Sequence, residues 1–444
     1  MLKKPYINNG YFRKYRGNSS WSFIKIIACV MLITFFGNQL HIYQERPTKN
    51  ITIFIHGTLL TFLALLNPLK TYTQTIKTTD WYYKCLQALR GDSDLLHDSI
   101  ILEEGLRKID PLLLYQSSKL YSGLTKAGLP GKGAYQAIGA YNMISQLINK
   151  NQHQDSNNVY YTFGFNGILS HTHRKETSLK FYEEINKLVT ECLQSGFKPI
   201  LNLCGYSHGG NLILLLAHAE LIHKQNLHID KVMLFGTPIQ TETAIYANHP
   251  MFSKIYNFFS EGDNVQNSDS FSTSSASSFR TFKEICTVHN LEILPNKVYD
   301  IRLLAAENPT VFGHFSYWFF NKYYDTWTNN NPSSAQMVLD TISPLPVAIF
   351  APLFLNLIDH HTSNDMNDID INFKVEDQLL EIQLLDGVSK AEIAKSENIY
   401  FPYSKIKKFT GLPGQKTESS SSNTTSFLKN LGAGISAIVQ SIID

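Results

Sequence analysis

Six short apolar runs, separated by segments with helical spacing, constrain the fold of this chain more than any other feature of its sequence. The runs are rich in β-branched and aromatic residues, which favour buried strands. They span residues 52–56, 159–163, 199–204, 232–235, 255–259 and 298–304. Helical patterns lie between several of them, for example in residues 176–194 and 210–224. Strands that alternate with helices predict an α/β fold, with a mostly parallel sheet of about six strands and helices on both faces.

Three segments stand outside this alternation. Residues 67–155 separate the first two runs, and their apolar groups recur at helical spacings, which predicts a helical insertion or lid after the first core strand. The repeating part would then span residues 50–330. Residues 331–417 are predicted to form a C-terminal extension, in which the alternation across residues 369–376 indicates a half-exposed strand. Residues 418–444 read as a Ser/Thr-rich linker followed by a short amphipathic helix.

The composition excludes several classes of protein. Hydrophobic residues make up 43% of the 444 residues, which is enough for a large core and excludes disorder as the main state. The net charge is only +2, which disfavours a nucleic-acid partner. Five scattered cysteines without a CxxC pair indicate neither a disulfide framework nor a zinc site. His171 and His173 have no cysteine nearby and are expected to lie in a solvated turn. We expect no metal and no cofactor.

The first 45 residues carry the pattern of a signal or membrane anchor. Six cations and no acidic residue precede an apolar run over residues 26–37, and the chain stays uncharged as far as Tyr43. This pattern predicts export or membrane anchoring, mostly without cleavage, with the rest of the chain on the non-cytoplasmic side. The alternative is a buried first helix in a cytoplasmic protein, since twelve strongly apolar residues are few for a membrane span.

One run carries chemistry: Gly205-Tyr206-Ser207-His208-Gly209, a Gly-x-Ser-x-Gly motif followed by Gly210. An apolar strand is predicted before the motif and a helix after it. A serine on so sharp a strand-to-helix turn holds a strained backbone that lifts its hydroxyl clear of the sheet. Side chains two residues to either side would collide, so glycine is needed there. The backbone N–H of His208 would then face the oxygen of a bound acyl group. The alternative is a plain glycine-rich turn.

With this motif and its flanks, residues 50–320 resemble the α/β-hydrolase superfamily, in particular its lipase and esterase branch. Phe54-Ile55-His56-Gly57-Thr58 looks like the His-Gly segment after an early strand of that family. The resemblance implies that a backbone N–H of Thr58 or Leu59 is the second oxyanion donor beside that of His208. The alternative is that His56 and Gly57 are an ordinary strand end. The stretch from Asn38 to Ile51 is too short for the first antiparallel strands of the full family fold, so a reduced sheet is expected.

The resemblance places the acid of a catalytic triad on the turn after a later strand. Residues 258–265 provide that turn, and Asp263 suits the position because a small-residue turn would project its carboxylate over the edge of the sheet. Glu261 is the nearby rival, and Asp269 and Asp300 are weaker candidates. The alternative for Asp263 is a solvated turn aspartate.

The resemblance also places a histidine in the loop after the last strand, residues 298–304. His314 follows that strand and would take the proton from the serine. His289 precedes the strand, which disfavours it, and His360 and His361 lie in the extension. The alternative for His314 is a packed histidine in an aromatic setting.

The residues together indicate a serine hydrolase that cleaves carboxylic esters through an acyl-enzyme. Ser207 would be the nucleophile, His314 the base and Asp263 the residue that orients it. The apolar insertion and the anchor favour a lipid or another acyl ester as substrate. An acyl transferase or thioesterase would use the same residues. The alternative from another class is a non-catalytic, membrane-tethered binding protein on a hydrolase scaffold.

Overall fold

The computed structural model describes the greater part of residues 46–394. The described residues are 46–57, 105–109, 138, 141–148, 157–165, 170–269, 273, 277–292, 297–318, 334–342, 346–360, 369–376, 379–385 and 390–394. They form an α/β fold around one mixed sheet of ten strands, in the order β10-β9-β8-β7-β6-β5-β4-β1-β3-β2. The N-terminal segment 1–45 and the terminal segment 418–444 lie outside the described residues.

Most of the sheet is parallel, as the alternation predicts. The strands are β1 (Thr48–Ile55), β2 (Gly105–Ile109), β3 (Asn157–Gly164), β4 (Lys198–Tyr206), β5 (Ile229–Phe235), β6 (Phe252–Phe259), β7 (Val298–Ala305), β8 (Ile369–Glu376), β9 (Leu379–Leu384) and β10 (Lys390–Ala394). Parallel pairing runs from β8 to β3, while β2, β9 and β10 pair antiparallel at the two ends of the sheet. All six apolar runs are strands of this sheet.

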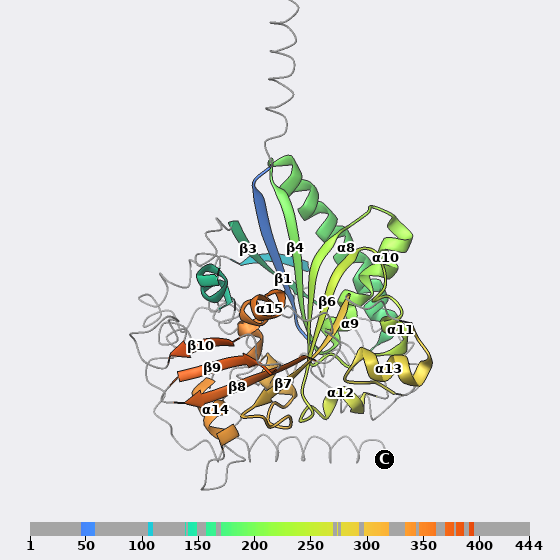
Figure 1. Cartoon of the computed structure of the whole chain (residues 1–444). Coiled ribbons are helices and arrows are strands. Elements are labelled where there is room, and N and C mark those ends of the chain that lie inside the picture. The colour runs from blue at the N-terminus through green and yellow to red at the C-terminus, as the bar shows by residue number, and fades with distance from the viewer. Residues whose placement is uncertain are drawn as a thin grey trace, which may run out of the picture. The chain divides into compact units, whose positions relative to one another are not determined.

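Helices cover both faces of the sheet. They are α8 (His171–Gln194), α9 (His208–Leu214), α10 (Leu216–His223), α11 (Thr241–Ala244), α12 (Val265–Ser268), α13 (Phe282–His289), α14 (Ser334–Ile342) and α15 (Ala351–Asp359), with the 3₁₀ turns η1 (His314–Tyr317) and η3 (Val347–Phe350). Figure 1 shows α8 and α10 beside the central strands and α15 over the sheet.

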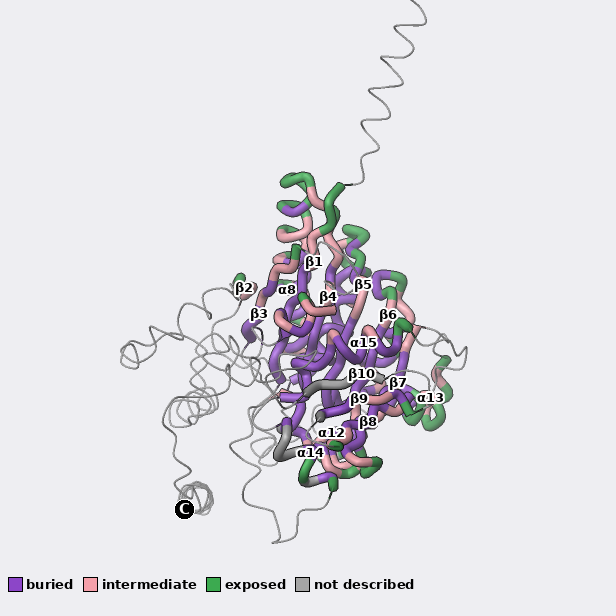
Figure 2. The backbone as a smooth tube through the Cα atoms, turned by 60° about the vertical axis from the view of Figure 1, so that its left-hand side comes forward, coloured by how far each residue is buried: buried purple, intermediate pink, exposed green. Residues whose placement is uncertain are grey.

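Two hydrophobic clusters form the core, one on each face of the sheet. Successive residues of β1 divide between them: Ile53 and Ile55 pack with α8, α9 and α10, whereas Phe54 packs with α14 and α15. The alternation follows from the pleat of a strand, which sends neighbouring side chains to opposite faces. The central strands are buried along most of their length (Figure 2). Strands covered on both sides are expected to be apolar at nearly every position.

The prediction of about six strands is wrong, because four more strands join the sheet. One of them, β2, lies inside the segment 67–155 that was predicted to be helical. Residues 141–148 of that segment are helical as expected, and most of the rest lies outside the described residues. The strand β2 pairs with the edge of β3, so backbone pairing overrides the local helical pattern there.

The other three strands come from the predicted C-terminal extension. In Figure 1, β8, β9 and β10 lie side by side at one end of the sheet, coloured orange to red. The described part of residues 331–417 is therefore built into the sheet and does not form a separate tail. Residues 369–376 are a strand with one covered side, as predicted: Ile369, Ile371 and Phe373 are buried in the cluster that includes α14 and α15, whereas Asp370 and Lys374 are partly exposed and Glu376 is exposed. Asn372 is the exception, since it is fully buried although it belongs to the polar set.

No helix within the described ranges is long and apolar enough to cross a membrane. The predicted anchor lies in the segment before residue 46, which these ranges do not include.

Candidate active site

Ser207 occupies a strained turn between β4 and α9. Its backbone has φ 51° and ψ −129°, a conformation that a residue with a side chain rarely adopts. Holding it costs on the order of 1–3 kcal/mol, so the surroundings must enforce it. The N–H of Ser207 donates to the carbonyl of Phe235 at 2.9 Å, and its own carbonyl accepts from the N–H of Gly210 at 3.0 Å. These bonds tie both ends of the turn to β5 and α9.

Glycines make this turn possible, as the motif predicts. A Cβ on Gly205 would lie 2.8 Å from the Cα of Gly210. A Cβ on Gly209 would collide with the carbonyl oxygen of His56, and one on Gly210 would collide with the hydroxyl of Thr237. The three glycines therefore let α9 approach the ends of β4, β1 and β5.

His314 links Ser207 to Asp263. Its Nε2 lies 3.1 Å from the hydroxyl oxygen of Ser207, and its Nδ1 lies 2.8 Å from Oδ2 of Asp263. All three residues are buried, with 2%, 7% and 1% of Ser207, His314 and Asp263 exposed. An ionised carboxylate can only accept, so Nδ1 carries the hydrogen and Nε2 is left to accept from the serine. The three residues thus form one continuous chain of hydrogen bonds.

The carboxylate of Asp263 is fixed by its own turn. Its Oδ1 accepts from the backbone N–H groups of Val265 at 3.0 Å and Gln266 at 3.3 Å, which leaves Oδ2 for His314. Gly236 makes room for it, since a Cβ there would lie 2.9 Å from Oδ2 of Asp263. Gly236 also has φ +58°, which glycine adopts without strain.

The other acids that the sequence offered are engaged elsewhere. Glu261 is exposed at the surface and accepts from Arg302 at 2.8 Å. Asp269 is buried against His208, with 3.1 Å between Oδ2 and Nε2. Asp300 accepts from Asn257 at 2.7 Å and from the N–H of Phe282 at 3.1 Å, at the start of α13. Among these acids, only Asp263 has a bond to His314 in the structure.

The alternative histidines that the structure describes contact other residues. His289 ends α13 and packs edge-on against Phe279. His360 is exposed at the end of α15, with its Nδ1 2.7 Å from the carbonyl oxygen of Asn356. His361 lies outside the described residues. The imidazole of His314, in contrast, packs against the ring of Tyr206, the residue directly before Ser207, with 4.9 Å between the ring centroids.

The predicted oxyanion donors are partly described. His208 is the first residue of α9, and the first N–H groups of a helix have no acceptor within it. Thr58 and Leu59 lie outside the described residues. The preceding Gly57 is described and lies against Ser207, because a Cβ on Gly57 would lie 2.5 Å from the Cβ of Ser207. The last described residue before this segment therefore lies beside Ser207.

The described residues offer no metal site, since no group of three or more histidine, cysteine or carboxylate side chains could hold an ion among them. The expectation of a solvated turn at His171 and His173 is wrong. Both residues lie in the first turn of α8, where the hydroxyl of Ser170 caps the helix by accepting from the N–H of His173 at 3.2 Å. His171 is buried, and burial lowers its pKa to about 4.

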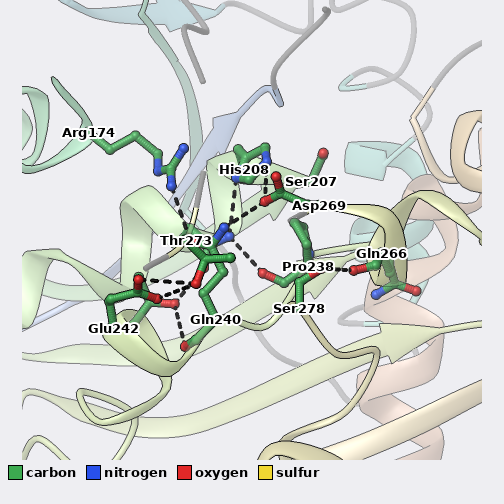
Figure 3. Close-up of polar contacts among 12 residues, drawn as sticks. Arg174, Ser207, His208, Pro238, Gln240, Glu242, Gln266, Asp269, Thr273 and Ser278 are labelled. Atoms are coloured by element: carbon green, nitrogen blue, oxygen red, sulfur yellow. Dashed lines mark hydrogen bonds and ion pairs between the residues drawn. The ribbon is translucent and has the colours of Figure 1, made fainter. Parts of the chain in front are cut away.

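The sequence did not predict one part of the site, namely the side chain of His208 and its polar neighbours (Figure 3). Asp269 was considered only as a rival triad acid, although its partner is a different histidine. The sequence signal was weak, because the members come from separate elements: Arg174, His208, Asn211, Gln240 and Asp269.

Chemically, this arrangement can activate a hydroxyl. A serine whose hydrogen is shared with a neutral, oriented imidazole can attack an electrophilic carbon while the imidazole takes the proton. No family model, curated protein or solved structure matches the chain.

Proposed function

We propose that this protein is a serine hydrolase of the α/β-hydrolase kind that cleaves carboxylic esters. The observation that carries the proposal is the chain of hydrogen bonds from Asp263 through His314 to Ser207, at 2.8 and 3.1 Å. The backbone strain at Ser207 also supports the proposal, because hydrogen bonds to Phe235 and Gly210 hold that turn and the glycines beside it leave room for no side chain. A buried turn without chemistry would have no need for a strained serine aimed at an oriented imidazole.

In the first half of the reaction, the hydroxyl oxygen of Ser207 attacks the acyl carbon while Nε2 of His314 accepts the proton. The negative charge that develops on the carbonyl oxygen is held by the N–H of His208 and by a donor from Thr58 or Leu59. The positive charge on His314 is stabilised by Asp263. The intermediate then expels the alcohol, which takes the proton from His314, and leaves an acyl group on Ser207.

In the second half, water attacks the acyl carbon and gives its proton to His314. Collapse of the second intermediate returns that proton to Ser207 and releases the carboxylic acid. The preference for a lipid or another apolar acyl ester is drawn from the sequence, namely the apolar insertion 67–155 and the N-terminal segment.

A panel of p-nitrophenyl esters with increasing acyl length tests the proposal on the purified chain, with Ser207→Ala as the matched control. We expect hydrolysis by the wild-type chain, a preference for the longer acyl groups and no hydrolysis above background by the variant. Analysis of the products with and without an added alcohol separates hydrolysis from acyl transfer. A wild-type chain that is folded and inert toward every ester would refute the proposal.

A further inference from the structure

The loop after β6 carries two buried aspartates, and each engages a different histidine beside the nucleophile. Asp263 engages His314, as described above. Asp269 engages His208, with 3.1 Å between Oδ2 and Nε2, and the two side chains are only 4% and 5% exposed. Figure 3 shows this second pair next to Ser207. The residue whose N–H would hold the oxyanion therefore has its own carboxylate partner.

The second nitrogen of His208 is also engaged. The side-chain N–H of Asn211 donates to Nδ1 of His208 at 3.4 Å and to the carbonyl of Pro238 at 2.9 Å. The hydroxyl of Thr243 donates to the side-chain oxygen of Asn211 at 2.6 Å, which fixes the orientation of this amide. Nδ1 of His208 thus accepts, so Nε2 carries the hydrogen and donates it to Asp269.

Asp269 is in turn held by a buried polar chain. The amide of Gln240 donates to Oδ2 of Asp269 at 2.6 Å, and its oxygen accepts from Arg174 at 3.1 Å. Arg174 and Gln240 are both fully buried. The arginine offers a positive charge to offset the carboxylate, and the network joins α8, α9, α11 and the loop after β6. Burial lowers the pKa of His208, while Asp269 opposes that shift, which agrees with a neutral imidazole at pH 7.

We propose that Asp269 is a positioning residue for the reaction, which acts by anchoring His208 and so fixing the direction of its backbone N–H. This inference rests on the proposed function. The strain at Ser207 would be relieved by rotation of the peptide between residues 207 and 208, and that rotation would turn the N–H away from the oxyanion. An imidazole held at both nitrogens opposes the rotation. The helix α9 spans only seven residues and benefits from such an anchor.

The test measures kcat and KM of Asp269→Asn and of two variants of His208 that differ in whether the new side chain can donate to Asp269. In His208→Gln the amide nitrogen can take the place of Nε2 and still donate to Asp269, whereas His208→Leu cannot. We expect kcat to fall by about 10- to 100-fold in Asp269→Asn and His208→Leu with KM within about threefold, since loss of an oxyanion donor costs about 10²–10³. Because its amide can still donate to Asp269, His208→Gln should recover part of this loss, with a kcat at least about fivefold above that of His208→Leu.

A second readout separates positioning from folding. A trifluoromethyl ketone adds to Ser207 and places a full negative charge where the oxyanion forms, and an alcohol product analogue does not. Affinity for the ketone should fall in proportion to kcat/KM in Asp269→Asn, while affinity for the alcohol stays unchanged. If folded Asp269→Asn keeps kcat and ketone affinity within twofold, or if His208→Leu and His208→Gln behave alike, the inference is overturned. An inert wild-type chain would instead refute the proposed function.

Discussion

Gly57 and Ser207 touch at the ends of two neighbouring strands: a Cβ on Gly57 would lie 2.5 Å from the Cβ of Ser207 and 2.9 Å from the carbonyl oxygen of Tyr206. Neither backbone can yield easily, because β1 and β4 pair along their whole length up to this point. The position of Ser207 therefore requires a residue without a side chain at position 57.

Substitution of Gly57 should damage the site more than the fold. We expect Gly57→Ala to lower kcat/KM by at least about 100-fold, since a shift of about 1 Å at the reacting atom can cost that much. Gly313→Ala is the matched control, because Gly313 also adjoins a site residue but a Cβ there meets nothing within 4 Å. The control should stay within about threefold of the wild type in ester hydrolysis. If Gly57→Ala and Gly313→Ala have equal kcat/KM, the claim that Ser207 requires glycine at residue 57 is wrong.

Triad residues should act as a unit. We expect His314→Ala to lower kcat/KM by about 10⁴-fold or more and Asp263→Asn by about 10²- to 10⁴-fold. The double variant Ser207→Ala/His314→Ala should be little worse than either single one. Glu261→Gln is the control two residues away from Asp263, and it should keep full activity because Glu261 faces Arg302 at the surface. Full additivity in the double variant would contradict the coupling of Ser207 with His314, and a damaging Glu261→Gln would argue against Asp263 as the acid.

Asp300 should make stability depend on pH. Burial raises its pKa to about 6, from an ordinary value near 4. The folded state thus binds this proton more tightly than the unfolded state. The stabilisation that protonated Asp300 gives the folded state is fully present below about pH 4. It is lost as the pH rises through about 6, which lowers the free energy of unfolding by on the order of 3 kcal/mol. Urea unfolding of the wild type and Asp300→Asn between pH 4 and 7 measures this. The wild type should lose stability relative to the variant as pH rises.

If the difference in free energy of unfolding between the wild type and Asp300→Asn does not change with pH, the raised pKa of Asp300 is refuted. If the wild type gains stability relative to the variant as pH rises, the hydrogen bonds to Asp300 outweigh its burial. Asp300 accepts from Asn257, Phe282 and Lys283, and each bond favours the ionised form.

The N-terminal segment is predicted to hold the protein at a membrane. All ten strands of the sheet lie after residue 47, so a chain that begins at Arg46 should keep its fold and hydrolyse esters as the full-length chain does. We expect the full-length chain to stay in the membrane fraction after alkaline carbonate extraction, with its C-terminus open to protease in spheroplasts. Release by carbonate together with protection from protease would support the cytoplasmic alternative.

The central strands could be predicted from the sequence because each is buried on both faces, which leaves a run of apolar residues. The edge strands could not. Gly105-Leu106-Arg107-Lys108-Ile109 carries two cations in five residues, and its pairing with β3 is non-local. The strand at 369–376 was recognised, but the sequence could not show that it pairs with β7, because the partner lies far away along the chain.

The site residues also divide into those that a local motif predicts and those that only the fold brings together. Ser207 is found by a local motif, since strand, glycines and helix are contiguous. Asp263 and Glu261 lie two residues apart on one turn, and only the fold of that turn decides which carboxylate meets His314. The pair of His208 and Asp269 was missed because nothing local connects residues on α9 with the loop after β6.

Covalent labelling of Ser207 tests the central claim most directly. A fluorophosphonate reacts with a serine only where an oriented base activates it, so the purified chain should gain one label on the peptide that contains Ser207. Ser207→Ala should take up none, and His314→Ala should be labelled at least about 100-fold more slowly. If the folded wild-type chain takes up no label, or if Ser207→Ala is labelled at the wild-type rate, the proposed hydrolase is contradicted.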